Sequence, residues 1–154
     1  MSVRTSASSF DDMAAYETTV VSNASPYAAF TYLSDLQKLP EWDPAFASVE
    51  APQMIESGAT FDAVAAFYGR RIPLEVEVTE LEPGESFSLK ATGKRIEIDY
   101  RVVVDARPTG CAITVSTTAK LSGLLRPLDG GLNAALESTE RRLSKALQKR
   151  LVSV

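Results

Sequence analysis

The chain has 154 residues, of which 45% are hydrophobic and 23% charged, as is typical of one globular domain with its own core. Its formal net charge of −4 argues against a general affinity for nucleic acid, which needs a basic surface. The sequence holds no histidine and one cysteine, which excludes an internal disulfide, a histidine-dependent nucleophile and a histidine-ligated metal site.

Residues 1–12 are polar and rich in serine, and the chain contains no run of about 18 apolar residues. We therefore expect a flexible N-terminal tail over residues 1–12, a single domain over residues 13–154 and no integral membrane association. The tail lacks the apolar stretch of a secretory signal, so a cytoplasmic location is the default expectation. The chain has no phosphate-binding loop or dinucleotide fingerprint, and no cofactor is expected.

The first elements are predicted to be a strand and two short helices. Residues 14–23 favour a strand because threonine, valine and tyrosine are common there. Ser25 and Pro26 predict the start of a helix, since serine caps free amides and proline is tolerated in the first turn. We expect Pro40 to end this helix and residues 39–44 to form a short second helical turn.

From Phe46 onward the apolar residues alternate with a period of two, which is typical of strands with one buried face. Glycines at two tight turns, Gly69-Arg70 and Gly93-Lys94, are expected to take the positive φ of type II′ hairpins. Six further strands are predicted, over residues 46–54, 59–68, 71–82, 85–92, 95–106 and 111–121.

The C-terminal part of the chain predicts one long amphipathic helix. Its apolar stripe consists of residues three to four positions apart: Leu132, Leu136, Thr139, Leu143, Leu147 and Leu151. The helix could begin near Leu124 and be bent or loosened at Gly130-Gly131, since glycine is poor helix sequence. The predicted fold class is α+β: a curved antiparallel sheet of seven strands wrapped around this long helix, with two short helices between strands 1 and 2.

Three short motifs stand out: Asn23-Ala24-Ser25-Pro26, the segment from Phe30 to Asp35 with its Leu33-Ser34-Asp35, and Leu39-Pro40-Glu41-Trp42. These motifs and the order of the elements resemble the START/SRPBCC superfamily with its helix-grip fold. Within it, the branch of bacterial polyketide cyclase/dehydrase and lipid-transport-like proteins is the most similar, over roughly residues 14–151. The resemblance implies a cavity between the sheet and the long helix for a hydrophobic or amphipathic ligand. Some catalytic members use histidine, which this chain lacks.

The inward-facing positions are the candidates for lining such a cavity. Trp42 could stack on a ligand at the cavity mouth or pack the short helices onto the sheet edge. The hydroxyl of Tyr100 needs a partner, which could be a ligand carbonyl or Thr139. Small residues such as Ala63 leave room for a ligand unless helix and sheet are simply close-packed. The ligand-binding candidates are Trp42, Phe46, Phe61, Phe67, Tyr100, Val102, Thr117, Leu132, Leu136 and Thr139.

Three functions remain open at this point. The sequence favours binding or transport of a lipid-like or polyketide-like small molecule, with no catalytic residue assigned. The alternative is a cyclase or dehydratase in which Tyr100, or a buried Asp62 or Glu75, acts as acid or base. A second alternative is a protein-interaction module of the stress or toxin–antitoxin type, with an exposed apolar patch at Leu124, Leu125 and Leu128. The edges of the sheet would permit a homodimer.

Overall fold

The structure is a computed structural model that describes residues 6–7, 12–67, 70–121, 142–143, 145–146 and 148–149. Its core is one antiparallel sheet with the strand order β1-β2-β8-β7-β6-β5-β4-β3. The strands are β1 (Ser6–Ala7), β2 (Asp12–Ser22), β3 (Phe46–Glu50), β4 (Thr60–Phe67), β5 (Arg70–Glu82), β6 (Ser86–Gly93), β7 (Ile96–Arg107) and β8 (Gly110–Leu121). The helices are α1 (Pro26–Ser34), the 3₁₀ turn η1 (Leu36–Lys38) and α2 (Leu39–Trp42).

The seven predicted strands are confirmed, and a two-residue strand, β1, adds to the β2 edge of the sheet. β1 falls within the predicted tail, whose flexibility stays a prediction. β3 is shorter than expected and ends at Glu50, shortly before Pro52, which has no N–H to donate to the ladder. Gly69 of the predicted Gly69-Arg70 turn lies outside the described residues, and Arg70 is the first residue of β5.

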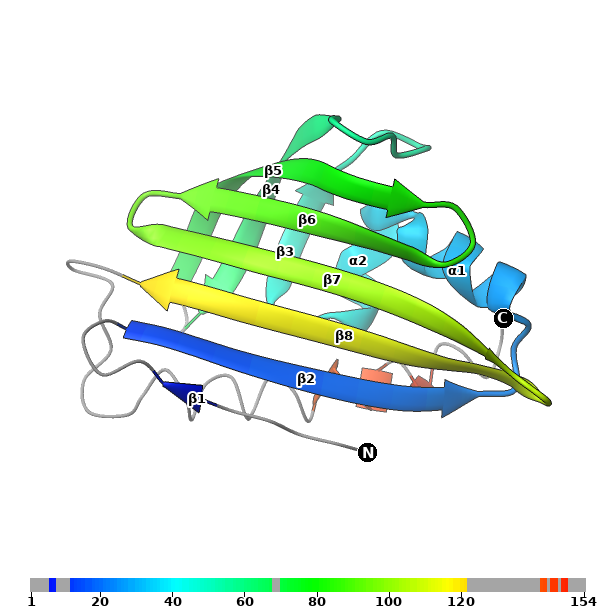
Figure 1. Cartoon of the computed structure of the whole chain (residues 1–154). Coiled ribbons are helices and arrows are strands. Elements are labelled where there is room, and N and C mark those ends of the chain that lie inside the picture. The colour runs from blue at the N-terminus through cyan, green and yellow to red at the C-terminus, as the bar shows by residue number, and fades with distance from the viewer. Residues whose placement is uncertain are drawn as a thin grey trace.

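The sheet curls, and the helices lie inside the curve. In Figure 1, β3 and β4 lie behind the strands that face the viewer, and α1 and α2 also lie on that far side. α1 packs against β7 and β8, and α2 packs against β3. The Phe30 ring of α1 meets the Phe87 ring of β6 edge to face, with centroids 6.1 Å apart. The short helices are therefore held on the concave face of the sheet by apolar contacts.

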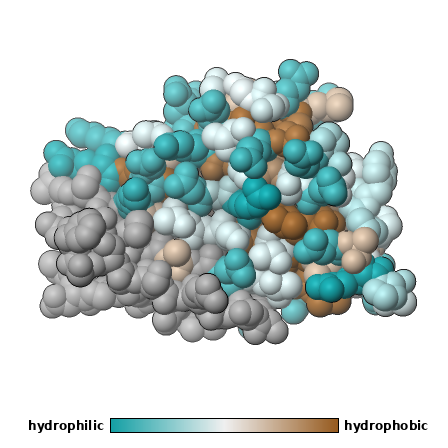
Figure 2. All heavy atoms as spheres, viewed as in Figure 1, coloured by the Kyte–Doolittle hydropathy of each residue, from teal (hydrophilic) through white to brown (hydrophobic). Residues whose placement is uncertain are grey.

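The two faces of the sheet differ as the alternation predicts. In β5, Ile72, Leu74, Val76 and Val78 are buried while the residues between them are exposed. β7 repeats this pattern around the buried Tyr100. The face turned to the viewer in Figure 2 is mostly hydrophilic, with apolar atoms visible in small areas between the polar side chains. The concave face thus carries the core, and the convex face carries surface ion pairs such as Lys90–Glu97 at 2.9 Å.

The first helix begins as predicted but ends earlier. The hydroxyl of Ser25 accepts a hydrogen bond from the amide of Ala28 at 3.1 Å, which confirms the N-cap. The helix ends at Ser34, and Asp35 follows with the non-helical ψ of 84°. Pro40 does not end it, because it lies in the first turn of α2, where a missing N–H is tolerated.

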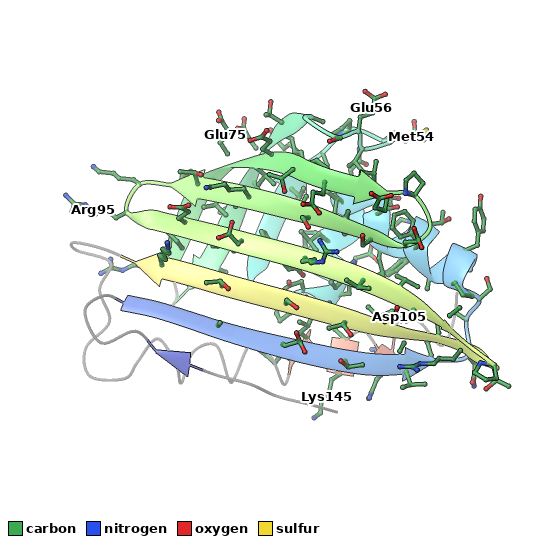
Figure 3. All side chains as sticks on the ribbon, viewed as in Figure 1. Met54, Glu56, Glu75, Arg95, Asp105 and Lys145 are labelled. Atoms are coloured by element: carbon green, nitrogen blue, oxygen red, sulfur yellow. The ribbon has the colours of Figure 1, made fainter. Side chains whose placement is uncertain are left out.

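The turn between β6 and β7 corrects the prediction for Gly93. Gly93 pairs with Ile96, so Lys94 and Arg95 form the turn, at the hairpin tip where Figure 3 labels Arg95. The positive φ, 66°, belongs to Arg95 and not to the glycine. A Cβ at position 93 would lie 2.6 Å from the carbonyl oxygen of Pro73 on β5. Glycine is needed here because the neighbouring strand approaches closely, and not for the turn.

The predicted C-terminal helix lies mostly outside the described residues, as does the predicted apolar patch at Leu124, Leu125 and Leu128. Six of its residues are described, and all six are helical: 142–143, 145–146 and 148–149. Leu143 is fully buried in the core of the sheet and Ala146 packs against that core, while Lys145 is exposed (Figure 3). Among the described helices, none has the length and apolar character needed to cross a membrane.

Candidate ligand-binding site on the concave face

Three aromatic side chains meet near the middle of the concave face. The Trp42 ring, at the end of α2, stacks on the Tyr100 ring of β7 with centroids 6.5 Å apart and planes 26° apart. Phe46, the first residue of β3, meets the Tyr100 ring edge to face at 5.7 Å. Trp42 is completely buried, so it lies against the face of the sheet rather than at an exposed mouth. The three rings connect α2, β3 and β7 into one apolar cluster.

A buried carboxylate completes this cluster. The Tyr100 hydroxyl donates a hydrogen bond to Oδ2 of Asp43, and Oδ1 of Asp43 accepts from the amide of Ala45 at 2.9 Å. The position of Asp43 follows from the local sequence, because an aspartate before Pro44 favours a turn in which its side chain caps the amide two residues later. The Tyr100 hydroxyl therefore has a protein partner, Asp43. The sequence had predicted Thr139 or a ligand carbonyl as that partner.

Asp43 lies in an unusual electrostatic environment. Burial away from water raises the pKa of its carboxyl above the ordinary value. The hydrogen bonds from Tyr100 and from the amide of Ala45 oppose this rise, as does the positive charge of Arg142 on the C-terminal helical segment. The site thus brings an acid of raised pKa together with a phenol inside an apolar cluster, a combination that can hold or move a proton.

Thr117 of β8 lies beside this cluster. It is the direct register partner of Tyr100, and its side chain is buried on the same face. In the part of the chain that the structure describes, two buried side-chain polar atoms have no hydrogen-bond partner: Oγ1 of Thr117 and Nε1 of Trp42. Both belong to residues adjoining Tyr100.

The structure brings several of the predicted site residues together. Phe61 and Val102 are also buried on the inward side of the sheet, with 8% and 0% of their surface exposed. Small residues accompany them on the same side: Ala63, Ala65, Ala91 and Ala119. The side chain of Phe67, and Leu132, Leu136 and Thr139 as a whole, lie outside the described residues.

The prediction of Asp62 or Glu75 as a buried acid is wrong. The two residues face each other across β4 and β5, and both are exposed on the convex face, where Figure 3 labels Glu75. Together with Glu50 they line an open hollow of about 430 Å³ on that face. Strand alternation places them outside because the inward positions of β4 and β5 are apolar.

Sequence reasoning missed Asp43, the one buried acid of the cluster. The Asp43-Pro44 pair was a visible turn signal, but a turn aspartate is usually exposed. Its burial depends on the neighbouring Trp42 ring and on Tyr100, which is 57 residues away in the chain. Among the described residues, no group of three or more acidic or cysteine side chains is arranged to hold a metal ion.

A curled antiparallel sheet with short helices and a buried aromatic site on its concave face defines a protein of the helix-grip class. The chain belongs to the family described as polyketide cyclase / dehydrase and lipid transport, whose sequence model matches residues 13–152. No sequence among the curated proteins matches this chain.

Solved structures share the fold at low sequence identity. The Zhui aromatase/cyclase from Streptomyces sp. R1128 has a TM-score of 0.68 and 13% identity, over 90% of this chain and 93% of that one. A START superfamily protein from Mycobacterium smegmatis has a TM-score of 0.67 and 14% identity, over 90% and 96% of the two chains. Ara h 8.0201 has a TM-score of 0.63 and 18% identity, over 92% and 99%. These structures confirm the expected fold, and the family model over residues 13–152 confirms the expected polyketide cyclase/dehydrase and lipid-transport family.

Proposed function

We propose that this protein binds or transports a hydrophobic or amphipathic small molecule, lipid-like or polyketide-like, on the concave face of its sheet. The supporting observation is the cluster of Trp42, Phe46 and Tyr100, which offers stacking surfaces inside an apolar environment. Pockets for such molecules combine aromatic and apolar walls with a few placed polar groups, and Asp43 and Thr117 supply polar groups here.

The alanines of the concave face support the same proposal. Ala63 and Ala65 on β4 point inward beside Phe61. Each occupies less of the region that the sheet encloses than a larger apolar side chain would. Ala91 and Ala119 do the same on β6 and β8. A ligand would fill this volume and would bury its own apolar surface, which gains about 25 cal/mol for each Å² removed from water.

Titration with an apolar fluorescent probe, combined with native mass spectrometry, tests the proposal. We expect saturable probe binding and a co-purifying or added apolar ligand in the mass spectrum. Ala63→Phe, which fills the concave side, should weaken probe binding, whereas Ala66→Phe, on the opposite side of the same strand, should not. A protein that binds neither probe nor ligand would contradict the proposal.

A second candidate function is a cyclase or dehydratase that uses the same site. The hydrogen-bonded pair of Tyr100 and Asp43 favours it, because a buried acid of raised pKa beside a phenol suits general acid–base chemistry. Incubation with a reactive poly-β-ketone should then give a cyclised product that has lost water, and Tyr100→Phe should suppress it. If the ketone binds and is recovered unchanged, the protein is a carrier and the second candidate fails.

A further inference from the structure

The two unpaired polar atoms of the concave face carry information about the ligand. Trp42 is completely buried and Thr117 is 8% exposed, yet among the described residues Nε1 of the first and Oγ1 of the second find no hydrogen-bond partner. Buried polar groups are rarely left unpaired, because removing them from water without a new partner costs free energy. An unpaired group at a candidate binding site is therefore a candidate contact for something that binds there.

Both residues adjoin the same ring. Trp42 stacks on Tyr100, and Thr117 stands directly across from Tyr100 on the neighbouring strand, so the Cβ atoms of that pair are expected to be about 5 Å apart. The hydroxyl of Tyr100 is engaged by Asp43. The two residues with unpaired atoms thus both adjoin a fixed ring whose own polar group is already bonded.

We propose that Trp42 Nε1 and Thr117 Oγ1 form a polar subsite that binds a neutral oxygen, a ketone or hydroxyl, on an otherwise apolar ligand. This inference rests on the proposed function and adds the chemistry of the ligand's polar group. The indole N–H is a donor only, so its partner must be an acceptor atom. The threonine hydroxyl can donate to the same oxygen or accept from a hydroxyl.

The neighbouring acid sets the preference for a neutral group. Both carboxylate oxygens of Asp43 already accept hydrogen bonds within the protein, from Ala45 and Tyr100. A ligand carboxylate placed beside this buried acid would meet like charge, or would have to give up its hydration without a paired cation. Arg142, the cation whose charge acts on Asp43, has an exposed side chain. The subsite therefore selects a ketone or an alcohol against a fatty-acid type of head group.

Three rings of one shape test the inference: fluorenone, fluorene and fluorene carboxylic acid. We expect the native protein to bind fluorenone about fivefold more tightly than fluorene, the factor that a net hydrogen bond of about 1 kcal/mol gives. Binding of the acid should be the weakest of the three. Thr117→Val and Trp42→Phe should each bring the ratio of the fluorenone affinity to the fluorene affinity close to one, because the hydrogen bond to the ketone is lost.

Thr114→Val is the matched control. Thr114 lies on the same strand as Thr117 but on its other face, where its hydroxyl is bonded to that of Thr19 at 3.0 Å. This variant should keep the fluorenone preference. If Trp42→Phe does not fold, Thr117→Val carries the test alone, because a methyl replaces an unpaired hydroxyl and should keep or raise the melting temperature of the ligand-free protein.

The outcomes separate the inference from the proposed function. Equal affinity for fluorenone and fluorene, or tightest binding of the acid, overturns the subsite while leaving an apolar binding protein. A fluorenone preference that survives both Thr117→Val and Trp42→Phe also overturns it. If none of the three rings binds, the proposed function and the subsite both fail.

Discussion

The hydroxyl of Tyr100, in the middle of β7, donates a hydrogen bond to Oδ2 of Asp43, the residue that directly follows α2. The bond joins residues 57 positions apart and is buried. It fixes the short helices to the sheet and places an acid inside the aromatic cluster. Stability, pH dependence and the candidate chemistry of the site all depend on this contact.

Tyr100→Phe should destabilise the protein by about 1–3 kcal/mol, the cost of leaving a buried acceptor without its donor. Urea unfolding followed by fluorescence of Trp42, which stacks on this ring, would measure the change. Tyr27→Phe is the control, since Tyr27 is 78% exposed and should change stability by less than about 0.5 kcal/mol. Equal effects of the two substitutions would show that the buried bond contributes nothing.

Asp43→Asn should change how stability depends on pH. The folded-state pKa of Asp43 is raised by burial, so the native protein holds this proton more tightly than the unfolded chain does. This tighter proton binding stabilises the folded protein by its full amount below about pH 4, the unfolded-state pKa of an aspartate. The stabilisation is lost as the pH rises through the folded-state pKa of Asp43. Asparagine does not titrate in this range.

Unfolding free energies of the native protein and of Asp43→Asn, measured from about pH 4 to pH 7, check this sign. The native protein should lose stability relative to the variant as the pH rises. Other carboxylates titrate in both proteins and cancel in the difference. A difference that stays constant, or that grows in favour of the native protein, would mean that the carboxyl is not destabilised by burial.

Leu143→Ala should cost about 2–5 kcal/mol, as for other large-to-small changes in a core. Leu143 is fully buried in the core cluster, although it lies on the C-terminal helical segment. Lys145→Ala, on the exposed side of the same segment, should have almost no effect. Thermal unfolding of both variants checks whether this segment is part of the cooperative core; a small effect of Leu143→Ala would exclude that.

Gly110→Ala should be more damaging than Gly58→Ala. Both glycines have positive φ, 102° and 89°, so alanine brings backbone strain of about 1–2 kcal/mol at either site. Only at Gly110 would the new Cβ meet the backbone, 2.0 Å from the carbonyl oxygen of Ser22, which adds roughly 1–3 kcal/mol. Denaturant midpoints of the two variants would show the difference; similar midpoints would mean that β2 can move away from the β7–β8 turn.

The local sequence was enough for most of the fold. Ser25 and Pro26 marked the helix start because capping involves only neighbours in the chain. Alternation in β5 and β7 marked the buried face because side chains of a strand point to opposite sides in turn. It correctly placed Tyr100, Val102 and Thr117 inward. The role of Gly93 could not be read in the same way, because the atom that excludes a side chain there belongs to Pro73 on another strand.

The sequence by itself determined which residues face the concave side, since that is a matter of period and of neighbouring residues. Only the tertiary structure decided that Asp43 is buried and that it bonds Tyr100. It also decided that, within the part of the chain that is described, Trp42 and Thr117 keep unpaired polar atoms. These facts arise where α2, β7 and β8 meet, and hydrogen bonding between segments distant in the chain leaves no periodic signal in any one of them.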